Sequence, residues 1–455
     1  MEVVVLAAGK GTRMYSDLPK VLHPLAGKPL LQHVIDTARA LNPRAIHIVY
    51  GYGGERVPQT LAAPDVNWVL QAQQLGTGHA VQQAAPQLND DAIALVLYGD
   101  VPLTRVETLR GLIDAARSDA LALLTIELPD PTGYGRIVRD SDGRVQAIVE
   151  HKDASATQRT ISEVNTGILA APAKALKGWL GGLSNDNAQR EYYLTDIVGA
   201  AARQGYKMET AQPSAAWEVM GVNSKTQLAE LERIAQVNRA RAFTDQGVML
   251  MDPARIDIRG ALECGRDVVI DINCVFEGAV KLGDRVRIGP HCVVRDATIG
   301  ADTVVNSHCV IEASSVGADC RVGPFARIRP DSVLDDHVHI GNFVEIKKSQ
   351  LGEGAKANHL AYVGDSTVGK KVNIGAGVIT VNYDGANKHR TVIGDNAFVG
   401  SDCQLIAPVN IGAGATVGAG STITSDVPPD VLAVNRARDT KIVPGWKRPS
   451  KKVQK

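Results

Sequence analysis

The run KLGDRVRIGPHCVV, residues 281–294, has an aliphatic residue at every sixth position, and glycine follows two of the three. The spacing continues to residue 423, with a few steps of five and one interruption after Ile374. Neither an amphipathic helix nor an alternating strand has this period, whereas a solenoid of short strands does. The sequence therefore predicts a left-handed parallel β-helix of hexapeptide repeats. The series comprises Leu282, Ile288, Val294, Ile299, Val305, Ile311, Val316, Val322, Ile328, Leu334, Ile340, Ile346, Leu351, Ala357, Val363, Val368, Ile374, Ile393, Val399, Leu405, Ile411, Val417 and Ile423.

The length and charge of the chain limit its class. At 455 residues the chain is expected to form about two to four domains, and the solenoid needs only the second half. Acidic and basic residues are equal in number, 49 each. This balance gives no electrostatic reason to expect a nucleic acid or an anionic membrane as the main partner.

The cysteines and the N-terminus indicate a cellular compartment. The six cysteines contain no C-x-x-C pair and no zinc spacing, so we interpret them as small apolar residues in a reducing compartment. The first apolar run ends at Gly9, short of the roughly 20 residues of a membrane span, and lacks the features of a signal peptide. We expect a cytoplasmic protein.

The first half alternates strand-like and helical runs. Strands are expected at 2–8, 45–50, 66–70, 92–98 and 120–126, and helices at 30–41, 77–85 and 106–116. Such alternation is typical of a mostly parallel sheet in a Rossmann-like α/β domain.

A glycine loop, Gly9-Lys-Gly-Thr-Arg-Met14, follows the first strand and could approach a phosphate closely. The loop matches neither the P-loop nor the dinucleotide fingerprint, so an ordinary tight turn is the alternative. Arg13 and Lys20 favour phosphate binding because both can neutralise a triphosphate.

Asp100 follows the predicted strand 92–98, at the carboxyl edge where parallel sheets bind ligands. A carboxylate beside phosphates suggests Mg²⁺. The alternative is a helix N-cap or turn aspartate.

The stretch 224–243 contains neither glycine nor proline, and Leu228, Leu231, Ile234 and Val237 recur at three-residue spacing. We predict a helical linker with Ser224 as its N-cap; a heptad dimerisation helix is the alternative.

The second half carries residues that a β-helix core does not need. His359 has Arg329, Glu345, Lys347 and Tyr362 nearby in the coil register, and residues 381–390 interrupt the six-residue period. A lone histidine on a solenoid is usually an ordinary surface residue. The nearby cations nevertheless suit a sugar phosphate, and a neutral imidazole could accept a proton from an amine.

Several motifs resemble the sugar-nucleotidyltransferase family. They are Leu6-Ala-Ala-Gly-Lys-Gly-Thr-Arg-Met14, Pro19-Lys20, Gln71-Ala-Gln-Gln-Leu-Gly-Thr-Gly-His79, Tyr98-Gly-Asp100, Gly133-Tyr-Gly-Arg136, Glu150-His-Lys152, Glu163-Val-Asn-Thr-Gly167 and Gly221-Val-Asn223. Together with the solenoid, they are similar to the bifunctional bacterial N-acetylglucosamine-1-phosphate uridyltransferases that are also glucosamine-1-phosphate N-acetyltransferases. The resemblance covers nearly the whole chain.

The resemblance implies roles for matching positions of the first half. The uridine, the phosphates and the sugar would be bound there, and Asp100 and Asn223 would ligate Mg²⁺. Binding of UTP and UDP-N-acetylglucosamine is implied for Leu6, Ala7, Ala8, Gly9, Lys20, Gln71, Gly76, Thr77, Tyr98, Gly99, Asp100, Gly135, Glu150, Asn165 and Asn223.

The same resemblance makes His359 the proton acceptor in acetyl transfer from acetyl-CoA to glucosamine 1-phosphate. It implies a homotrimer, with acetyl-CoA bound between neighbouring coils. The sugar phosphate would contact Arg329, Lys347, Tyr362 and Asn373, and acetyl-CoA would contact Ala376, Asn382, Tyr383, Ser401, Ala419 and Arg436.

The expected domains are a uridyltransferase over 1–223, a linker over 224–247, an acetyltransferase β-helix over 248–433 and a basic tail over 434–455. The tail is expected to be a solvated terminus, although it could assist an anionic cofactor. The product would be UDP-N-acetylglucosamine for peptidoglycan and lipopolysaccharide. Two alternatives are a single-activity pyrophosphorylase whose β-helix serves oligomerisation, and a degenerate chain acting as a scaffold.

Overall fold

A computed structural model describes residues 1–435 of the chain. The chain forms two compact units, one over Met1–Asn238 and one that starts at Arg239. No helix within the described residues combines the length and the apolar composition that a membrane crossing requires.

The first unit is built on a mostly parallel sheet in the order β11-β7-β10-β6-β1-β4-β5. Strand β10 runs antiparallel to both of its neighbours, and the β8–β9 hairpin extends from it. The five predicted strands are confirmed to within one residue at each end, whereas β8 to β11 were not predicted. The strands are β1 (Glu2–Ala7), β4 (Ile46–Tyr50), β5 (Asn67–Leu70), β6 (Ile93–Tyr98), β7 (Leu121–Glu127), β8 (Arg136–Arg139), β9 (Val145–Val149), β10 (Glu163–Pro172) and β11 (Met208–Ala211), with a separate pair β2 (Pro24–Leu25) and β3 (Lys28–Pro29).

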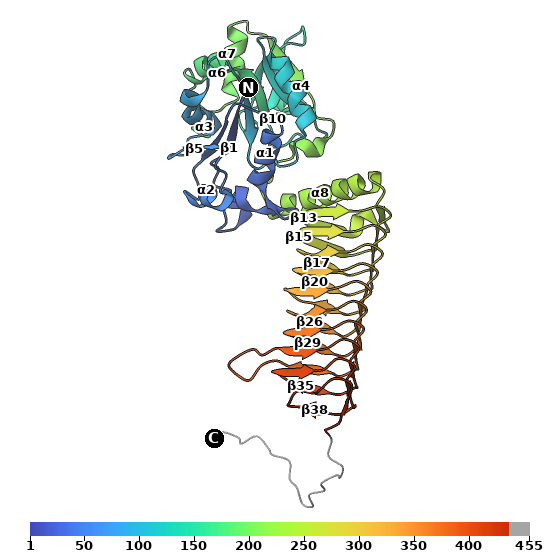
Figure 1. Cartoon of the computed structure of the whole chain (residues 1–455). Coiled ribbons are helices and arrows are strands. Elements are labelled where there is room, and N and C mark those ends of the chain that lie inside the picture. Colours follow the sequence, from blue (N-terminus) through green and yellow to red (C-terminus); the bar gives the residue numbers. More distant parts are fainter. Residues whose placement is uncertain (436–455) are drawn as a thin grey trace, which may run out of the picture. The chain divides into compact units, whose positions relative to one another are not determined.

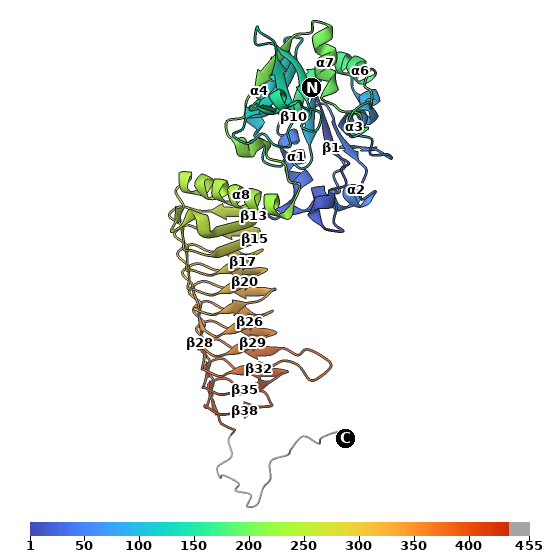
Figure 2. The same cartoon turned by 180° about the vertical axis from the view of Figure 1, so that it is seen from behind.

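Helices cover both faces of this sheet (Figures 1 and 2). Successive residues of a strand point to opposite faces, so Val3 and Val5 enter one core while Val4 enters the other. Helices α1 and α4 pack on the first core, and α3, α6 and α7 pack on the second. The helices are α1 (Leu30–Arg39), α2 (Arg56–Leu61), α3 (Thr77–Ala84), α4 (Val106–Ala116), α5 (Ala156–Arg159), α6 (Ala173–Leu180) and α7 (Asp196–Arg203).

The predicted linker helix is present as α8 (Lys225–Asp245). Ser224 is its N-cap, as predicted: its hydroxyl oxygen accepts a hydrogen bond from the Gln227 amide at 3.2 Å. Leu231 packs in a small core with Met14 and Leu25 of the first unit.

The second unit is a parallel β-helix with three strands per coil, and its coils stack as a column in Figure 1. One face consists of β12 (Met249–Leu250), β14 (Val269–Ile270), β16 (Arg287–Ile288), β19 (Val304–Val305), β22 (Arg321–Val322), β25 (His339–Asn342), β28 (Lys356–His359), β31 (Asn373–Ile374), β34 (Phe398–Val399), β37 (Thr416–Val417) and β39 (Leu432–Ala433). A second face consists of β17 (Val293–Arg295), β20 (Val310–Glu312), β23 (Arg327–Ile328), β26 (Glu345–Lys347), β29 (Tyr362–Gly364), β32 (Ile379–Val381), β35 (Gln404–Ile406) and β38 (Thr422–Ile423). A third consists of β18 (Thr298–Ile299), β21 (Ser314–Val316), β24 (Ser332–Leu334), β27 (Gln350–Leu351), β30 (Ser366–Val368), β33 (Thr391–Ile393) and β36 (Val409–Ile411), and the long β13 (Ile256–Cys264) and β15 (Cys274–Leu282) begin the stack.

The hexapeptide prediction is confirmed. Every aliphatic residue of the series lies in one buried core. Up to Ala357, each pairs with the residue three steps later in the series, as in Leu282 with Ile299 and Ile288 with Val305. Across the interruption the step is two, as in Ile374 with Val399. The cysteines are free and, apart from the partly exposed Cys264, buried.

The interruption of the repeat leaves the stack as a loop between β32 and β33, as predicted, and Figure 1 shows it projecting from the column of coils. Residues 382–390 form this loop, which we call the excursion. Asn373 still pairs with Phe398 across it. The extra residues therefore do not disturb the register of the coils.

Candidate active sites

A cavity of about 430 Å³ lies at the carboxyl edge of the first unit's sheet. The ends of β1 and β6 and the start of α3 contribute to it, which is where a doubly wound sheet binds ligands. The lining comprises Leu6, Ala7, Ala8, Gly9, Lys10, Lys20, Val21, Gln71, Gln74, Gly76, Thr77, Ala80, Tyr98, Asp100 and Glu191.

Ten of the fifteen positions predicted to bind the nucleotide line this cavity, and the others are Gly99, Gly135, Glu150, Asn165 and Asn223. Gly99 directly follows Tyr98, and its amide donates to the Leu6 carbonyl at 2.9 Å. The exposed Arg13 does not line the cavity, so of the two cations expected at the phosphates only Lys20 is brought to it.

The geometry at Gly76 requires glycine. Its φ is 111°, in the region that side chains disfavour, and a β-carbon there would lie 2.6 Å from the Tyr192 carbonyl oxygen. Gly76 precedes Thr77, the first residue of α3, so amide groups at the helix start border the cavity. Such groups favour anions.

Lys20 joins the two predicted metal ligands. Its ammonium group donates to the Asp100 carboxylate and, at 3.2 Å, to the side-chain oxygen of Asn223. The Val222 amide donates to the Asp100 carbonyl at 2.9 Å, which brings Asn223 beside Asp100. Both side-chain oxygens therefore face one cationic nitrogen.

The predicted alternative of Asp100 as a helix N-cap is excluded, since the next helix, α4, has Arg105 at that position. In residues 1–435 no three His, Cys, Asp or Glu side chains gather as a metal site. One carboxylate and one amide oxygen nevertheless fit Mg²⁺, which binds to proteins through few side chains and completes its shell with phosphate oxygens and water.

The predicted sugar-side residues gather near the β8–β10 pairing. The Asn165 amide donates to the Gly135 carbonyl at 2.9 Å, and the Glu150 carboxylate accepts from the Thr195 hydroxyl at 3.0 Å. Burial raises the pKa of Glu150 despite that bond. Burial likewise raises the pKa of Tyr98, with Glu150 the next contributor, so the phenol stays a hydrogen-bond donor.

In the second unit, register aligns His359 with three of the residues predicted to bind acetyl-CoA. Lys356 pairs with Asn373, then Phe398, then Thr416 in successive coils. Three residues beyond each lie His359, Ala376, Ser401 and Ala419, which therefore occupy one column along a corner of the β-helix.

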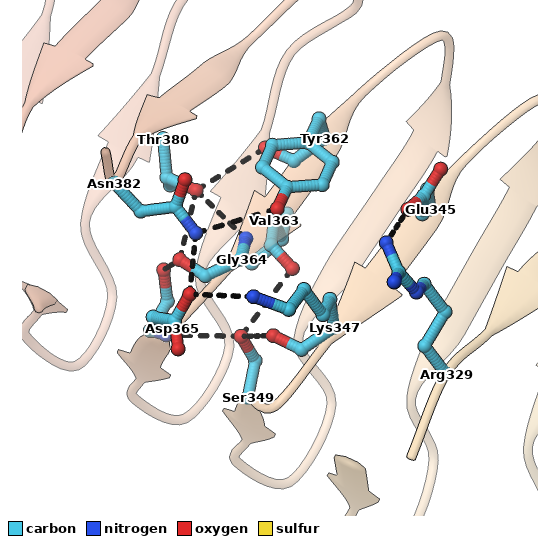
Figure 3. A network of polar contacts seen from close by, with 11 residues as sticks. Arg329, Glu345, Lys347, Ser349, Tyr362, Val363, Gly364, Asp365, Thr380 and Asn382 are labelled. Carbon is cyan, nitrogen blue, oxygen red and sulfur yellow. Dashed lines mark hydrogen bonds and ion pairs between the residues drawn. The ribbon is translucent and has the colours of Figure 1, made fainter. Parts of the chain in front are cut away.

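The predicted sugar-phosphate cations occupy a second column on the next face. Arg327 pairs with Glu345, so Arg329 and Lys347 lie at equivalent positions of adjacent coils. Both are paired with acids (Figure 3): Arg329 donates to Glu345 at 2.8 Å and Lys347 to Asp365 at 3.1 Å. Tyr362 is in register with Glu345.

His359 is exposed at the end of β28, and its Nδ1 lies 2.8 Å from the side-chain oxygen of Asn342, its register partner. A carboxamide oxygen can only accept, so the bond puts the proton of a neutral imidazole on Nδ1. Nε2 then keeps its lone pair. This arrangement suits a proton acceptor.

The excursion carries Asn382 at its base and Tyr383 in its exposed part. Asn382 is buried and donates to the Tyr362 hydroxyl at 3.3 Å. Lys388 lies over the Tyr383 ring, 4.2 Å from its centroid. Asn373 lies on the face of β28, next to Lys356 in register, and Arg436 is outside the described residues.

Sequence reasoning missed five cavity residues and two residues of the second unit. They are Lys10, Val21, Gln74, Ala80 and Glu191 in the cavity, and Asn342 and Asp365 in the second unit. Both of the latter contact a predicted residue one coil away, at a distance of 17 or 18 residues along the chain. Counting coils from His359 and Lys347 could have found them.

Family models match both units. Residues 3–247 match the MobA-like NTP transferase domain, residues 258–340 the GMPPB C-terminal domain, and residues 390–425 six repeats of the bacterial transferase hexapeptide. The fold, the two sites and these matches define an enzyme with a nucleotidyltransferase unit and a hexapeptide acyltransferase unit.

Curated relatives identify the particular family. The chain is 61% identical to the bifunctional protein GlmU of Nitrosospira multiformis over 453 residues, covering 99% of this chain and 98% of the relative. It is 62% identical to that of Ralstonia nicotianae and 60% to that of Aromatoleum aromaticum, with 99% of each chain covered. The chain belongs to the GlmU family of bifunctional proteins.

Proposed function

We propose that the enzyme makes UDP-N-acetylglucosamine in two steps. The β-helix, residues 248–433, acetylates glucosamine 1-phosphate with acetyl-CoA. The α/β domain, residues 1–223, then transfers uridylate from UTP to N-acetylglucosamine 1-phosphate and releases pyrophosphate. Residues 224–247 form the linker. The observation that carries the proposal is the set of polar contacts on the second unit: a plain scaffold has no need of His359 bonded to Asn342 at one corner or of two cations paired with acids on the next face.

In uridylyl transfer, a phosphate oxygen of the sugar 1-phosphate attacks the α-phosphorus of UTP, and the bond to pyrophosphate breaks. The chain's contribution is positioning and charge neutralisation. Lys20 neutralises phosphate charge, and the amides at the start of α3 receive anionic oxygens. Tyr98, Gly135, Glu150 and Asn165 hold the sugar.

Asp100 and Asn223 would hold Mg²⁺, whose double charge offsets the charge of the phosphates when the ion is bound. The contact of both oxygens with the Lys20 ammonium supports this assignment, because the two oxygens already converge on one cation. Lys20 has to release them for the ion and is then free to bind phosphate.

In acetyl transfer, the sugar amine attacks the thioester carbonyl of acetyl-CoA. Nε2 of His359 takes a proton from the amine, the carbon–sulfur bond breaks, and the CoA thiolate leaves and is protonated. Arg329 and Lys347 bind the sugar phosphate, with Tyr362 and Asn373 beside the sugar. Ala376, Asn382, Tyr383, Ser401, Ala419 and Arg436 contact acetyl-CoA.

The enzyme is proposed to be a cytoplasmic homotrimer that supplies cell-envelope polymers. Exposed apolar side chains along one corner of the stack support association of copies: Phe325, Phe343 and Leu360 are 46%, 55% and 61% exposed. The rings of Phe325 and Phe343 stack at 5.3 Å. Surfaces of this kind are typical of interfaces.

Two assays of the wild-type enzyme test the proposal: CoA release from acetyl-CoA with glucosamine 1-phosphate, and pyrophosphate release from UTP with N-acetylglucosamine 1-phosphate and Mg²⁺. We expect both. Pyrophosphate release without CoA release would instead support a single-activity pyrophosphorylase. If neither CoA nor pyrophosphate is released, the result would support the alternative of a degenerate chain that acts as a scaffold.

A further inference from the structure

Asp365 is a buried carboxylate that the reaction scheme above does not use. It lies at the corner between β29 and β30, is 8% exposed and has a φ of 49°. A buried charge is costly unless it is paired and hydrogen-bonded. Its partners therefore indicate why it is there.

Two proposed substrate-binding residues meet on one oxygen of this carboxylate (Figure 3). Lys347 donates to Asp365 Oδ2 at 3.1 Å, and the Asn382 amide nitrogen donates to the same oxygen. That nitrogen also lies 3.3 Å from the Tyr362 hydroxyl. One carboxylate thus connects a residue assigned to the sugar phosphate with one assigned to acetyl-CoA.

Asp365 also holds the neck of the excursion, by which we mean the two ends where it leaves and rejoins the coil. Asn382, bound by its carboxylate, is the first residue of the excursion, and the backbone amide of Thr391, just past its last residue, donates to the Asp365 carbonyl at 3.3 Å. The His389 amide closes the neck by donating to the Asn382 carbonyl at 2.8 Å. Both ends of the excursion are therefore attached near Asp365.

The fold itself does not require aspartate at this corner. The same corner of three preceding coils holds Ala313, Asp331 and Lys348, with φ of 41°, 62° and 47°. Asp331 is exposed, and within residues 1–435 no hydrogen bond or ion pair involves its carboxylate. The carboxylate of Asp365 therefore serves something other than the turn.

We propose that Asp365 is a positioning residue of the acetyltransferase site, which sets Lys347 for the sugar phosphate and anchors the excursion for acetyl-CoA. The proposal rests on the function proposed above. Lys347 keeps further N–H donors for phosphate while Asp365 fixes its direction.

The test uses two substitutions and a matched control in the full-length enzyme. Asp365→Asn keeps an oxygen for Asn382 but removes the charge that fixes Lys347. Asp365→Ala removes both contacts. Asp331→Ala places alanine at the equivalent left-handed corner, so it measures the backbone cost alone. Amide exchange of the coils away from the excursion reports that the β-helix of each variant is folded.

We expect Asp365→Asn to lower kcat/KM for glucosamine 1-phosphate about tenfold, with KM for acetyl-CoA within about twofold. In Asp365→Ala, KM for acetyl-CoA should also rise about tenfold, and amide exchange of residues 382–390 should accelerate. In enzyme that already carries Lys347→Met, adding Asp365→Asn should lower kcat/KM for glucosamine 1-phosphate by less than about twofold.

The inference is overturned if Asp365→Ala and Asp331→Ala have the same kinetics and the same amide exchange, or if the Lys347→Met background leaves the cost of Asp365→Asn undiminished. Failure of the proposed function differs from both outcomes, because the wild-type enzyme would then release no CoA. The exchange experiment would still report whether Asp365 anchors the excursion.

Discussion

The two candidate sites are built in opposite ways. The first is a concave cavity whose residues come from strand ends, a helix start and loops, spread from Leu6 to Glu191. The second is a set of columns on a repetitive surface, where residues 17 to 25 positions apart become neighbours through register. The cavity depends on how distant segments of the chain fold together, whereas the columns depend on the strand register between successive coils. The sites should therefore fail independently, and each should be sensitive to different changes.

The largest effect is expected from His359→Ala, which removes the only side chain assigned to proton transfer. Acetyl transfer should fall by about 10² to 10⁴-fold, the usual contribution of a general base, with uridylyl transfer unchanged. Release of CoA and of pyrophosphate measures the two. A parallel loss of uridylyl transfer would contradict the independence of the sites.

Asp100→Ala is the converse test. Without the carboxylate that faces Lys20 and Asn223, uridylyl transfer should fall by about 10²-fold, while acetyl transfer persists. Titrating activity with Mg²⁺ in Asp100→Ala and Asn223→Ala checks the metal role. Full activity of Asp100→Ala at the wild-type Mg²⁺ requirement would refute it.

Gly76→Ala tests the tight packing of the cavity. The new methyl group would lie 2.6 Å from the Tyr192 carbonyl in a disfavoured backbone conformation, so kcat/KM for UTP should fall about tenfold. Gly178→Ala in α6 is the matched control, because a β-carbon there meets nothing within 4 Å. Equal kinetics of the two variants would show that the cavity tolerates the added methyl group.

Asn342→Asp tests the hydrogen bond to His359. A carboxylate beside Nδ1 stabilises the imidazolium relative to the neutral imidazole. Since the proposed acetyl transfer uses neutral imidazole, the acid limb of its pH profile should move to higher pH, and the rate near pH 7 should fall a few-fold. The other titratable groups near His359 are Lys356 of the same strand and His339 of the adjacent strand. An unmoved pH profile would refute the contact.

The smallest effect concerns the excursion. Amides of Asn387 and Ala386 and the side chain of His389 lower the pKa of Asp384. A depressed pKa stabilises the loop above the ordinary carboxyl pKa of about 4, and that contribution is lost as the pH falls through the lowered value. Amide exchange of residues 382–390 should therefore quicken in acid relative to the rest of the β-helix, and Asp384→Asn should remove this difference.

The sequence predicted the regular part of the fold well, because burial leaves a periodic trace. The aliphatic series fills the β-helix core, and strands buried on both faces, such as β1 and β6, appear as unbroken apolar runs. Strand β10 and the β8–β9 hairpin escaped prediction. Their runs are partly exposed and mixed in polarity, so no period distinguishes them.

The sites were predicted less completely. Motifs indicated Lys20 and Asp100, and an unneeded histidine indicated His359, since each stands out chemically from its neighbours. Asp365 does not stand out, because aspartate is frequent at left-handed corners, and Asn342 is an ordinary polar residue at the end of a short strand. Their roles arise from register, which a sequence gives only after every coil of 17 or 18 residues has been counted.

The pairing of Asn373 with Phe398 across the excursion has a consequence for how such a chain can change. Added residues at a corner leave every later coil in step, whereas one added residue inside a strand would turn its apolar side chain outward. New loops can therefore be acquired at corners without refolding the rest. Insertions at corners can therefore add new functional residues to the surface of the β-helix while its core remains the same.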